Sequence, residues 1–251
     1  MGNAGLVAPR ALAFGEPDVP QGGGDPGLAV KLKWFGHAMF GVESPRGIRV
    51  VTDPYPRGMG YGPAGAEAEV VTISHEHFDH NAADEVGGEP VVLRGLGASG
   101  QWVRHARTLS DVQLTAIGGT YHDDRQGTIR GLNCLWRIET GGIRILHLGD
   151  LGHVPPPAVA AAAGRVDVLL VPVGGVYTID AGTADRVVDA YKPQVVIPMH
   201  YRTEAVKDWP IAPVDEFLKG KVGLRQLPDH ETAIDPERLP VSRELWLFPS
   251  G

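Results

Sequence analysis

The sequence predicts an α/β fold of the four-layer αββα type, in which two β-sheets pack face to face and helices cover the outside. Strand patterns dominate the first half of the chain, whereas strand and helix patterns alternate in the second half. The 251 residues suffice for one large domain or two small ones, and a hydrophobic content of 43% is typical of a globular protein with a sizeable core.

The first half of the chain contains a series of short strand patterns. Residues 30–35 alternate apolar and basic side chains, as a half-buried strand does, and residues 70–74 are rich in the β-branched residues of a buried strand. The other expected elements are strands at 38–43, 48–52, 90–93 and 112–117, a short helix at 82–86, a helix or turn at 101–106, and a Gly/Pro-rich loop at 56–65 that forms either a flap over a site or a surface excursion.

Helices enter the pattern in the second half. A hairpin is expected across Gly141-Gly142, and a proline run at 155–157 begins an alanine-rich helix that ends at Gly164. The hairpin strands span 132–139 and 143–148, and the elements expected after the alanine-rich helix are strands at 166–171, 195–198 and 222–227 and helices at 181–191 and 213–218.

Charge and cysteine content exclude several classes of protein. The net charge is −7 and no basic patch occurs in the sequence, so we expect no nucleic-acid partner. No apolar stretch is long enough to span a membrane. The single Cys134 excludes an intrachain disulfide and a cysteine metal cluster, and it is expected to be a buried structural thiol.

Residues 1–27 are expected to be a flexible leader. The segment 11–13 has the A-x-A pattern that signal peptidase cuts, but no basic region precedes it and Pro9 interrupts the apolar stretch. Two cellular locations are therefore compatible with the sequence: the cytoplasm, or the periplasm or the cell exterior if this leader is what remains of an export signal.

The most informative stretch is His75-Glu76-His77-Phe78-Asp79-His80, directly after the buried strand at 70–74. Loops that leave the carboxyl ends of strands commonly carry the chemistry of α/β proteins. Three imidazoles and a carboxylate within six residues are typical ligands of zinc, manganese or iron. In an extended loop His75 and His77 point the same way and could share one ion, while Asp79 and His80 could bind a second.

This motif resembles the metal signature of the metallo-β-lactamase superfamily, H-x-H-x-D-H. Four further residues follow strand patterns as the other motifs of that superfamily require: Asp53, His122, Asp150 and His200. The segments 34–38, 173–178 and 197–203 resemble the UlaG-like branch, which includes ascorbate-6-phosphate lactonase and the N-acyl-phosphatidylethanolamine phospholipase D enzymes. The chain departs from that branch at Leu151, where threonine is commoner.

The resemblance implies a hydrolase domain of metallo-β-lactamase fold over residues 28–251, with two divalent metal ions. Zn²⁺ is the first expectation, and Mn²⁺ or Fe²⁺ are the alternatives. Asp150 would bridge the ions, and Asp53 would orient the histidine loop without binding metal. The implied ligands are His75, His77 and His122 for the first ion and Asp79, His80 and His200 for the second.

The implied reaction is hydrolysis of an ester-like bond by a hydroxide that bridges the two metals, with Asp79 as the catalytic residue that orients it and accepts its proton. The bond is a phosphodiester, a lactone or a carboxylic ester in a small-molecule or lipid-like substrate. The alternatives are a β-lactamase or thioester hydrolase, and a metal-binding module without turnover.

Five further residues receive weaker assignments. His153, Tyr177 and Tyr201 are candidates for substrate binding, although each also fits a surface turn or ordinary packing. His147 is a candidate for support of the metal ligands, and His37 is expected to pack beneath the metal loops.

Overall fold

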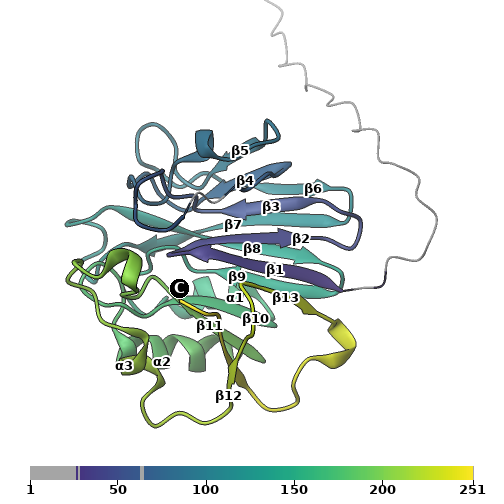
Figure 1. Cartoon of the computed structure of the whole chain (residues 1–251). Coiled ribbons are helices and arrows are strands. Elements are labelled where there is room, and N and C mark those ends of the chain that lie inside the picture. Colours follow the sequence, from purple (N-terminus) through teal and green to yellow (C-terminus); the bar gives the residue numbers. More distant parts are fainter. Residues whose placement is uncertain (1–26, 28, 63–64, 251) are drawn as a thin grey trace, which may run out of the picture.

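The computed structural model describes residues 27, 29–62 and 65–250, so the predicted leader lies outside the described residues apart from Gly27. Two β-sheets face one another (Figure 1). The first has the order β13-β1-β2-β3-β4-β5, with β1 at Val30–Gly36, β2 at Met39–Glu43, β3 at Arg49–Thr52, β4 at Val70–Ile73, β5 at Val91–Arg94 and β13 at Glu231–Ile234.

The second sheet has the order β12-β14-β11-β10-β9-β8-β7-β6. Its strands are β6 at Ala106–Leu109, β7 at Val112–Tyr121, β8 at Leu132–Thr140, β9 at Ile143–His147, β10 at Val168–Pro172, β11 at Val195–Met199, β12 at Leu224–Gln226 and β14 at Glu244–Leu247. The α-helices are α1 at Pro157–Ala163, α2 at Ala181–Tyr191 and α3 at Val214–Leu218.

The core lies between the two sheets because the strands present one apolar face to each other. In β1 the side chains of Val30, Leu32 and Trp34 are buried in this core, while Lys31 and Lys33 point outward and are exposed. Strands β10 and β11 are buried along their whole length, since helices cover the face that points away from the core. The predicted α/β sandwich is therefore confirmed.

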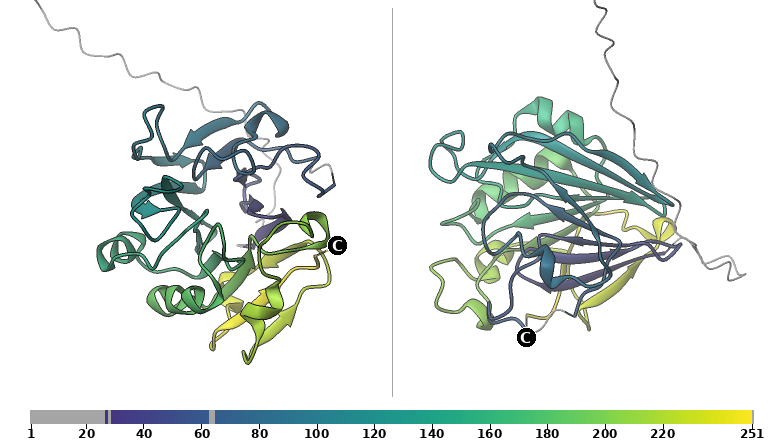
Figure 2. Two further views of the ribbon diagram at one scale, coloured as in Figure 1. Left: turned by 90° about the vertical axis from the view of Figure 1, so that its left-hand side faces the viewer. Right: turned by 90° about the horizontal axis from the view of Figure 1, so that it is seen from above.

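The outer layers of the sandwich are unequal. Among the described residues, all three α-helices lie on the side of the second sheet (Figure 2). A second layer of α-helices does not cover the first sheet. Instead, the segment after β3 packs Tyr55 against Met39, Val51 and Val71 and donates a hydrogen bond from the Tyr55 hydroxyl to the Phe35 carbonyl (2.7 Å).

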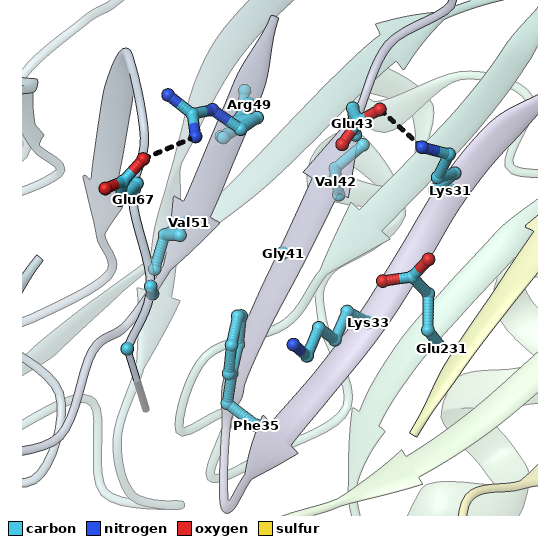
Figure 3. A pocket seen from close by; sticks show the side chains of 13 residues that line it. Lys31, Lys33, Phe35, Gly41, Val42, Glu43, Arg49, Val51, Glu67 and Glu231 are labelled. Carbon is cyan, nitrogen blue, oxygen red and sulfur yellow. Dashed lines mark hydrogen bonds and ion pairs between the residues drawn. The ribbon is translucent and has the colours of Figure 1, made fainter. Parts of the chain in front are cut away.

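Charged side chains lie on the outer face of β1, β2 and β3. Figure 3 shows Lys31 paired with Glu43 (2.7 Å) and Arg49 paired with Glu67 (2.9 Å) around a shallow hollow of about 230 Å³. Charged side chains that remain hydrated need no covering layer, which is why this face can do without helices.

The parallel strands gather their carboxyl ends at one edge of the sandwich. Strands β3 and β4 are parallel in the first sheet, and β9, β10 and β11 are parallel in the second. The residues that follow these five strands are Asp53, Ser74, Leu148, Val173 and His200. This shared edge brings the motifs together from positions far apart in the sequence.

Several elements differ from the sequence prediction. Residues 106–109 form the edge strand β6 by pairing with β7, whereas a helix or turn was predicted at 101–106. The strand predicted at 222–227 is β12 at Leu224–Gln226, and two strands that were not predicted follow it in the chain. Strand β13 pairs with β1, and β14 lies between β12 and β11. These short strands exist through pairing with distant partners, which no local pattern specifies. The predicted helix at 82–86 is a 3₁₀ turn at Ala83–Glu85.

Within the described part of the chain, no helix has both the length and the apolar character needed to cross a membrane.

Candidate metal centre

Three of the site residues have strained backbone conformations. His37, Asp53 and His200 follow strands or a strand turn and have positive φ angles of 52°, 41° and 51°. Such angles are rare outside glycine and collect at functional sites. Gly149 (φ 53°) belongs with them, since a Cβ there would lie 2.5 Å from Asn133 Oδ1 and 2.6 Å from Ser74 Oγ. Only glycine lets the chain bring Asp150 so close to the histidine loop.

Among the described residues, three groups of candidate ligands form at the shared edge, and the third, Asp53 with His75 and His80, overlaps the other two. The first contains His75, His77 and His122, whose ligand atoms lie within 4.8 Å of one another. The second contains His37, Asp79, His80 and His200, within the same limit. The predicted ligands of each ion therefore come together, and His37 joins the second group.

Asp150 lies between the two groups. Its Oδ2 atom lies 3.0 Å from His122 Nε2 in the first group and 3.4 Å from His200 Nε2 in the second. Its Oδ1 atom lies 3.1 Å from His80 Nε2. One carboxylate thus faces imidazoles from both ligand groups.

The polar atoms at this point are buried and unsatisfied. Within residues 27, 29–62 and 65–250, no hydrogen-bond partner exists for Asp150 Oδ1 or for the Nε2 atoms of His75, His80, His122 and His200. Buried polar atoms without partners are uncommon because each carries the full cost of its lost hydration. Convergent imidazole nitrogens and a carboxylate oxygen are the donor set that divalent zinc, manganese and iron accept. The residues present therefore fit such cations.

Hydrogen bonds on the far side of the rings fix the tautomers. Asp53 accepts from the Ser74 amide (2.7 Å) and the Ser74 hydroxyl (2.5 Å), and its Oδ2 lies 3.0 Å from His80 Nδ1. Because the Ser74 hydroxyl donates to Asp53, its oxygen accepts from His75 Nδ1 (2.9 Å). Both rings therefore carry hydrogen on Nδ1 and aim Nε2 into the site, as ligating histidines do.

Two supporting residues escaped the sequence analysis. Ser74 is one, and Asn133 on β8 is the other: its amide donates to the Leu148 carbonyl (2.9 Å) and its Oδ1 accepts from the Asp150 amide (3.0 Å). Neither residue type marks a metal site by itself. Ser74 directly follows β4, and Asn133 lies on β8 in the facing sheet. The position of Ser74 beside the histidine cluster is the only indication that the sequence offered.

Burial and charge together set the protonation of the centre. Burial holds the pKa of His75 well below 6.5 and also lowers the pKa of His77, so both rings are neutral and able to bind metal. Burial alone would raise the pKa of Asp150, but the imidazoles of His200, His80 and His122 outweigh it and hold this pKa well below the ordinary range.

The pKa of His80 shifts in the opposite direction to that of His75. Burial disfavours its charged form, yet the carboxylates of Asp150 and Asp79 outweigh burial and raise the pKa of His80 well above 6.5. In the absence of a cation, a proton on His80 therefore balances the carboxylates. A divalent cation supplies the same positive charge, so it displaces that proton on binding.

The remaining candidates lie in different surroundings. Tyr177 lines a cavity of about 660 Å³ together with His77, Asp79 and Asp150. His153 accepts a hydrogen bond from the Tyr121 amide (3.1 Å) at the wall of an adjoining hollow of about 450 Å³.

Two candidates turn inward. Tyr201 lies two residues after the end of β11, is 2% exposed and packs its ring 5.7 Å from that of Trp34, so its side chain lies in the core. His147 binds the Ala38 carbonyl (2.8 Å) and the Gly149 amide (3.0 Å), so it supports the loops on which the ligands lie.

Comparison with known proteins agrees with this fold. A family model, the β-lactamase superfamily domain, matches residues 31–200, and the chain belongs to this superfamily. The UPF0173 protein of Pyrococcus furiosus is 32% identical over 194 residues, which cover 71% of this chain and 87% of that protein. Within the superfamily, the chain is thus a member of the UPF0173 family.

Two further relatives carry functional descriptions. The UPF0173 metal-dependent hydrolase of Carboxydothermus hydrogenoformans is 29% identical over 215 residues, covering 75% of this chain and 90% of that protein. A solved structure from Thermotoga maritima, provisionally assigned as a zinc-dependent hydrolase of the metallo-β-lactamase superfamily, has 35% sequence identity and a TM-score of 0.70. The match covers 87% of this chain and 98% of that one.

Proposed function

We propose that this protein is a metal-dependent hydrolase that holds two divalent cations, with Zn²⁺ as the first expectation, and cleaves an ester-like bond. The observation that carries the proposal is the position of Asp150, whose two oxygens face imidazoles of both ligand groups. A carboxylate between two cation sites lowers the repulsion between the cations. The descriptions of the relatives support the same reaction class.

Each group of ligands would bind one of the two cations. His75, His77 and His122 would hold the first, and Asp79, His80 and His200 the second, with Asp150 shared. Cations held there supply Lewis acidity, which acidifies water and stabilises negative charge that develops on a substrate oxygen.

Asp79 is the residue of this centre best placed to handle a proton. It lines the 660 Å³ cavity, and its Oδ2 lies 3.1 Å from His37 Nε2 and 3.5 Å from His80 Nε2. Burial would raise its pKa, but His80 and the hydrogen bond from His37 outweigh burial and keep the carboxyl ionised. An ionised carboxylate at the cavity wall can orient a water molecule and accept its proton.

His37 acts on Asp79 and not directly on a cation in this proposal. Burial and then the neighbouring His200 lower the pKa of His37 to about 3, so its ring is neutral. With Nε2 turned to Asp79, His37 fixes which way the carboxylate faces.

Metal analysis combined with a substrate panel tests the proposal. Protein purified without chelator should contain up to two transition-metal ions per chain. It should hydrolyse at least one member of a panel of phosphodiesters, lactones and carboxylic esters, with thioesters and β-lactams as comparison, and EDTA should abolish that activity. Absence of bound metal after zinc and manganese have both been offered would refute the proposal.

A further inference from the structure

The walls around the metal centre also indicate what kind of molecule enters it. We propose that the ligand is an amphiphilic anion: Arg130 binds its negatively charged group, and an aromatic wall made by Phe78, Tyr177 and Trp209 binds its apolar group. This inference rests on the proposed function, because it names the substrate class of the same centre.

A buried carboxylate fixes the loop that carries Arg130. Asp123 directly follows the candidate ligand His122 and is only 3% exposed. Its two oxygens accept four backbone N–H bonds, at 2.8 to 3.0 Å, from residues on the same loop: Arg125, Gly127, Ile129 and Arg130. Four bonds to one buried carboxylate hold the loop in a single shape, so the position of Arg130 is set before any ligand arrives.

Arg130 lies where three hollows meet. It lines the 660 Å³ cavity, the 450 Å³ hollow and a third hollow of about 730 Å³, each of which also includes His77 or His122. Its guanidinium carbon lies over the Tyr177 ring, 5.6 Å from the ring centre, which is within cation–π range.

No described carboxylate forms an ion pair with Arg130, in contrast to Arg94 in the same 730 Å³ hollow, which pairs with Glu76 (2.5 Å). Guanidinium groups bind carboxylate, phosphate and sulfonate oxygens with paired, directional hydrogen bonds. A stacked arginine without an acidic partner, beside a metal centre, is therefore suited to receive the anionic group of a ligand.

The aromatic wall faces the same cavity. The Trp209 ring centre lies 6.3 Å from those of both Phe78 and Tyr177. Phe78 is 63% exposed although it belongs to the metal-binding loop, and an exposed aromatic side chain beside a cavity is typical of a binding site for an apolar group.

Backbone strain supports a positioned wall. Val176 precedes Tyr177 and has a φ angle of 58°, which is rare for a β-branched residue and costly. Its side chain is 54% exposed, so burial of the side chain does not offset the energetic cost of this φ angle. The strained turn instead directs Tyr177 toward both Arg130 and Trp209.

A pair of dyes that differ only in charge tests the inference without requiring turnover. 8-Anilinonaphthalene-1-sulfonate is an aromatic anion, and N-phenyl-1-naphthylamine is the same ring system without the sulfonate. Titrated by fluorescence into metal-loaded protein, the anionic dye should bind more tightly. Arg130→Gln should weaken the anionic dye by about tenfold and leave the neutral dye unchanged, because only the charge-assisted hydrogen bonds are lost.

Two further variants complete the experiment. Trp209→Ala should weaken both dyes, since it removes part of the apolar wall. Arg107→Gln changes an exposed arginine on β6 and should affect neither. Equal affinities of the two dyes for the wild type, or an equal response of both dyes to Arg130→Gln, would overturn the inference. A protein that discriminates the dyes as expected but hydrolyses nothing retains this ligand class and loses the proposed function.

Discussion

Nδ1 of His80 lies 3.0 Å from Oδ2 of Asp53, although 27 residues separate them, and both side chains are fully buried. The same carboxylate also accepts hydrogen bonds from the amide and the hydroxyl of Ser74. The hydroxyl oxygen of Ser74 in turn accepts a hydrogen bond from His75 Nδ1. One acid behind the site thus orients a ring from each of the two ligand groups.

Asp53→Asn should lower metal affinity by about 10- to 100-fold with the fold retained, because an amide cannot accept from Ser74 and His80 as a carboxylate does. Zinc affinity should be measured by competition with a chelator, and circular dichroism should report the fold. Asp84→Asn changes an exposed aspartate on the 3₁₀ turn and serves as the matched control. Unchanged zinc affinity in Asp53→Asn would show that Asp53 does not position the ligands.

Asp150→Asn should weaken the second metal most and reduce the hydrolysis rate by orders of magnitude. The substitution retains the size of the side chain but removes the charge that two cations would share. Metal stoichiometry and rate should both be measured on the folded variant, with Asp229→Asn, an exposed aspartate, as the control. Two tightly bound ions and a wild-type rate would exclude the shared-ligand role.

Stability of the metal-free protein should be greatest near the ordinary histidine pKa of about 6.5. Burial lowers the folded pKa of His75 and lowers that of His37 to about 3, so the unfolded chain alone takes up these protons and stability is lost as the pH falls below 6.5. The folded pKa of His80 is raised, because Asp150 and Asp79 outweigh burial, so its contribution is present below 6.5 and lost as the pH rises through the raised pKa.

Bound metal should abolish the loss of stability that the metal-free protein shows as the pH rises above 6.5. A cation replaces the proton on His80, so the free energy of unfolding of the metal-loaded protein should keep rising as the pH increases past 6.5. Urea unfolding across this pH range, with zinc and with chelator, measures both profiles. If the two profiles have the same shape, the raised pKa of His80 does not arise from the carboxylates of the metal centre.

Cys134 should resist thiol reagents in the native protein and react at once when the chain unfolds. Its side chain is fully buried on β8, and burial raises the pKa of the thiol to about 12, so the reactive thiolate is nearly absent. Because the chain has a single cysteine, the rate of modification by Ellman's reagent is a direct measure of global unfolding. Rapid modification of the native protein would show that β8 opens locally.

The sequence by itself determined the elements whose patterns are local. The two buried strands that became β10 and β11 are continuous apolar runs, and His75, His122, Asp150 and His200 each lie within three residues of a strand end. Parallel strands carry the residues at their carboxyl ends to one edge. The resemblance to the metallo-β-lactamase signature implied which of these residues would be ligands.

Only the tertiary structure decided which side chains support or surround those ligands. Ser74, Asn133 and Asp123 are ordinary polar residues in the sequence, and their roles depend on partners brought near by strand pairing. The same holds for Tyr201, whose ring packs near Trp34 in the core, and for β13 and β14, which form through contacts with distant strands. The reason is physical: local pattern fixes where a strand ends, whereas burial and hydrogen bonding depend on what the rest of the chain places opposite it.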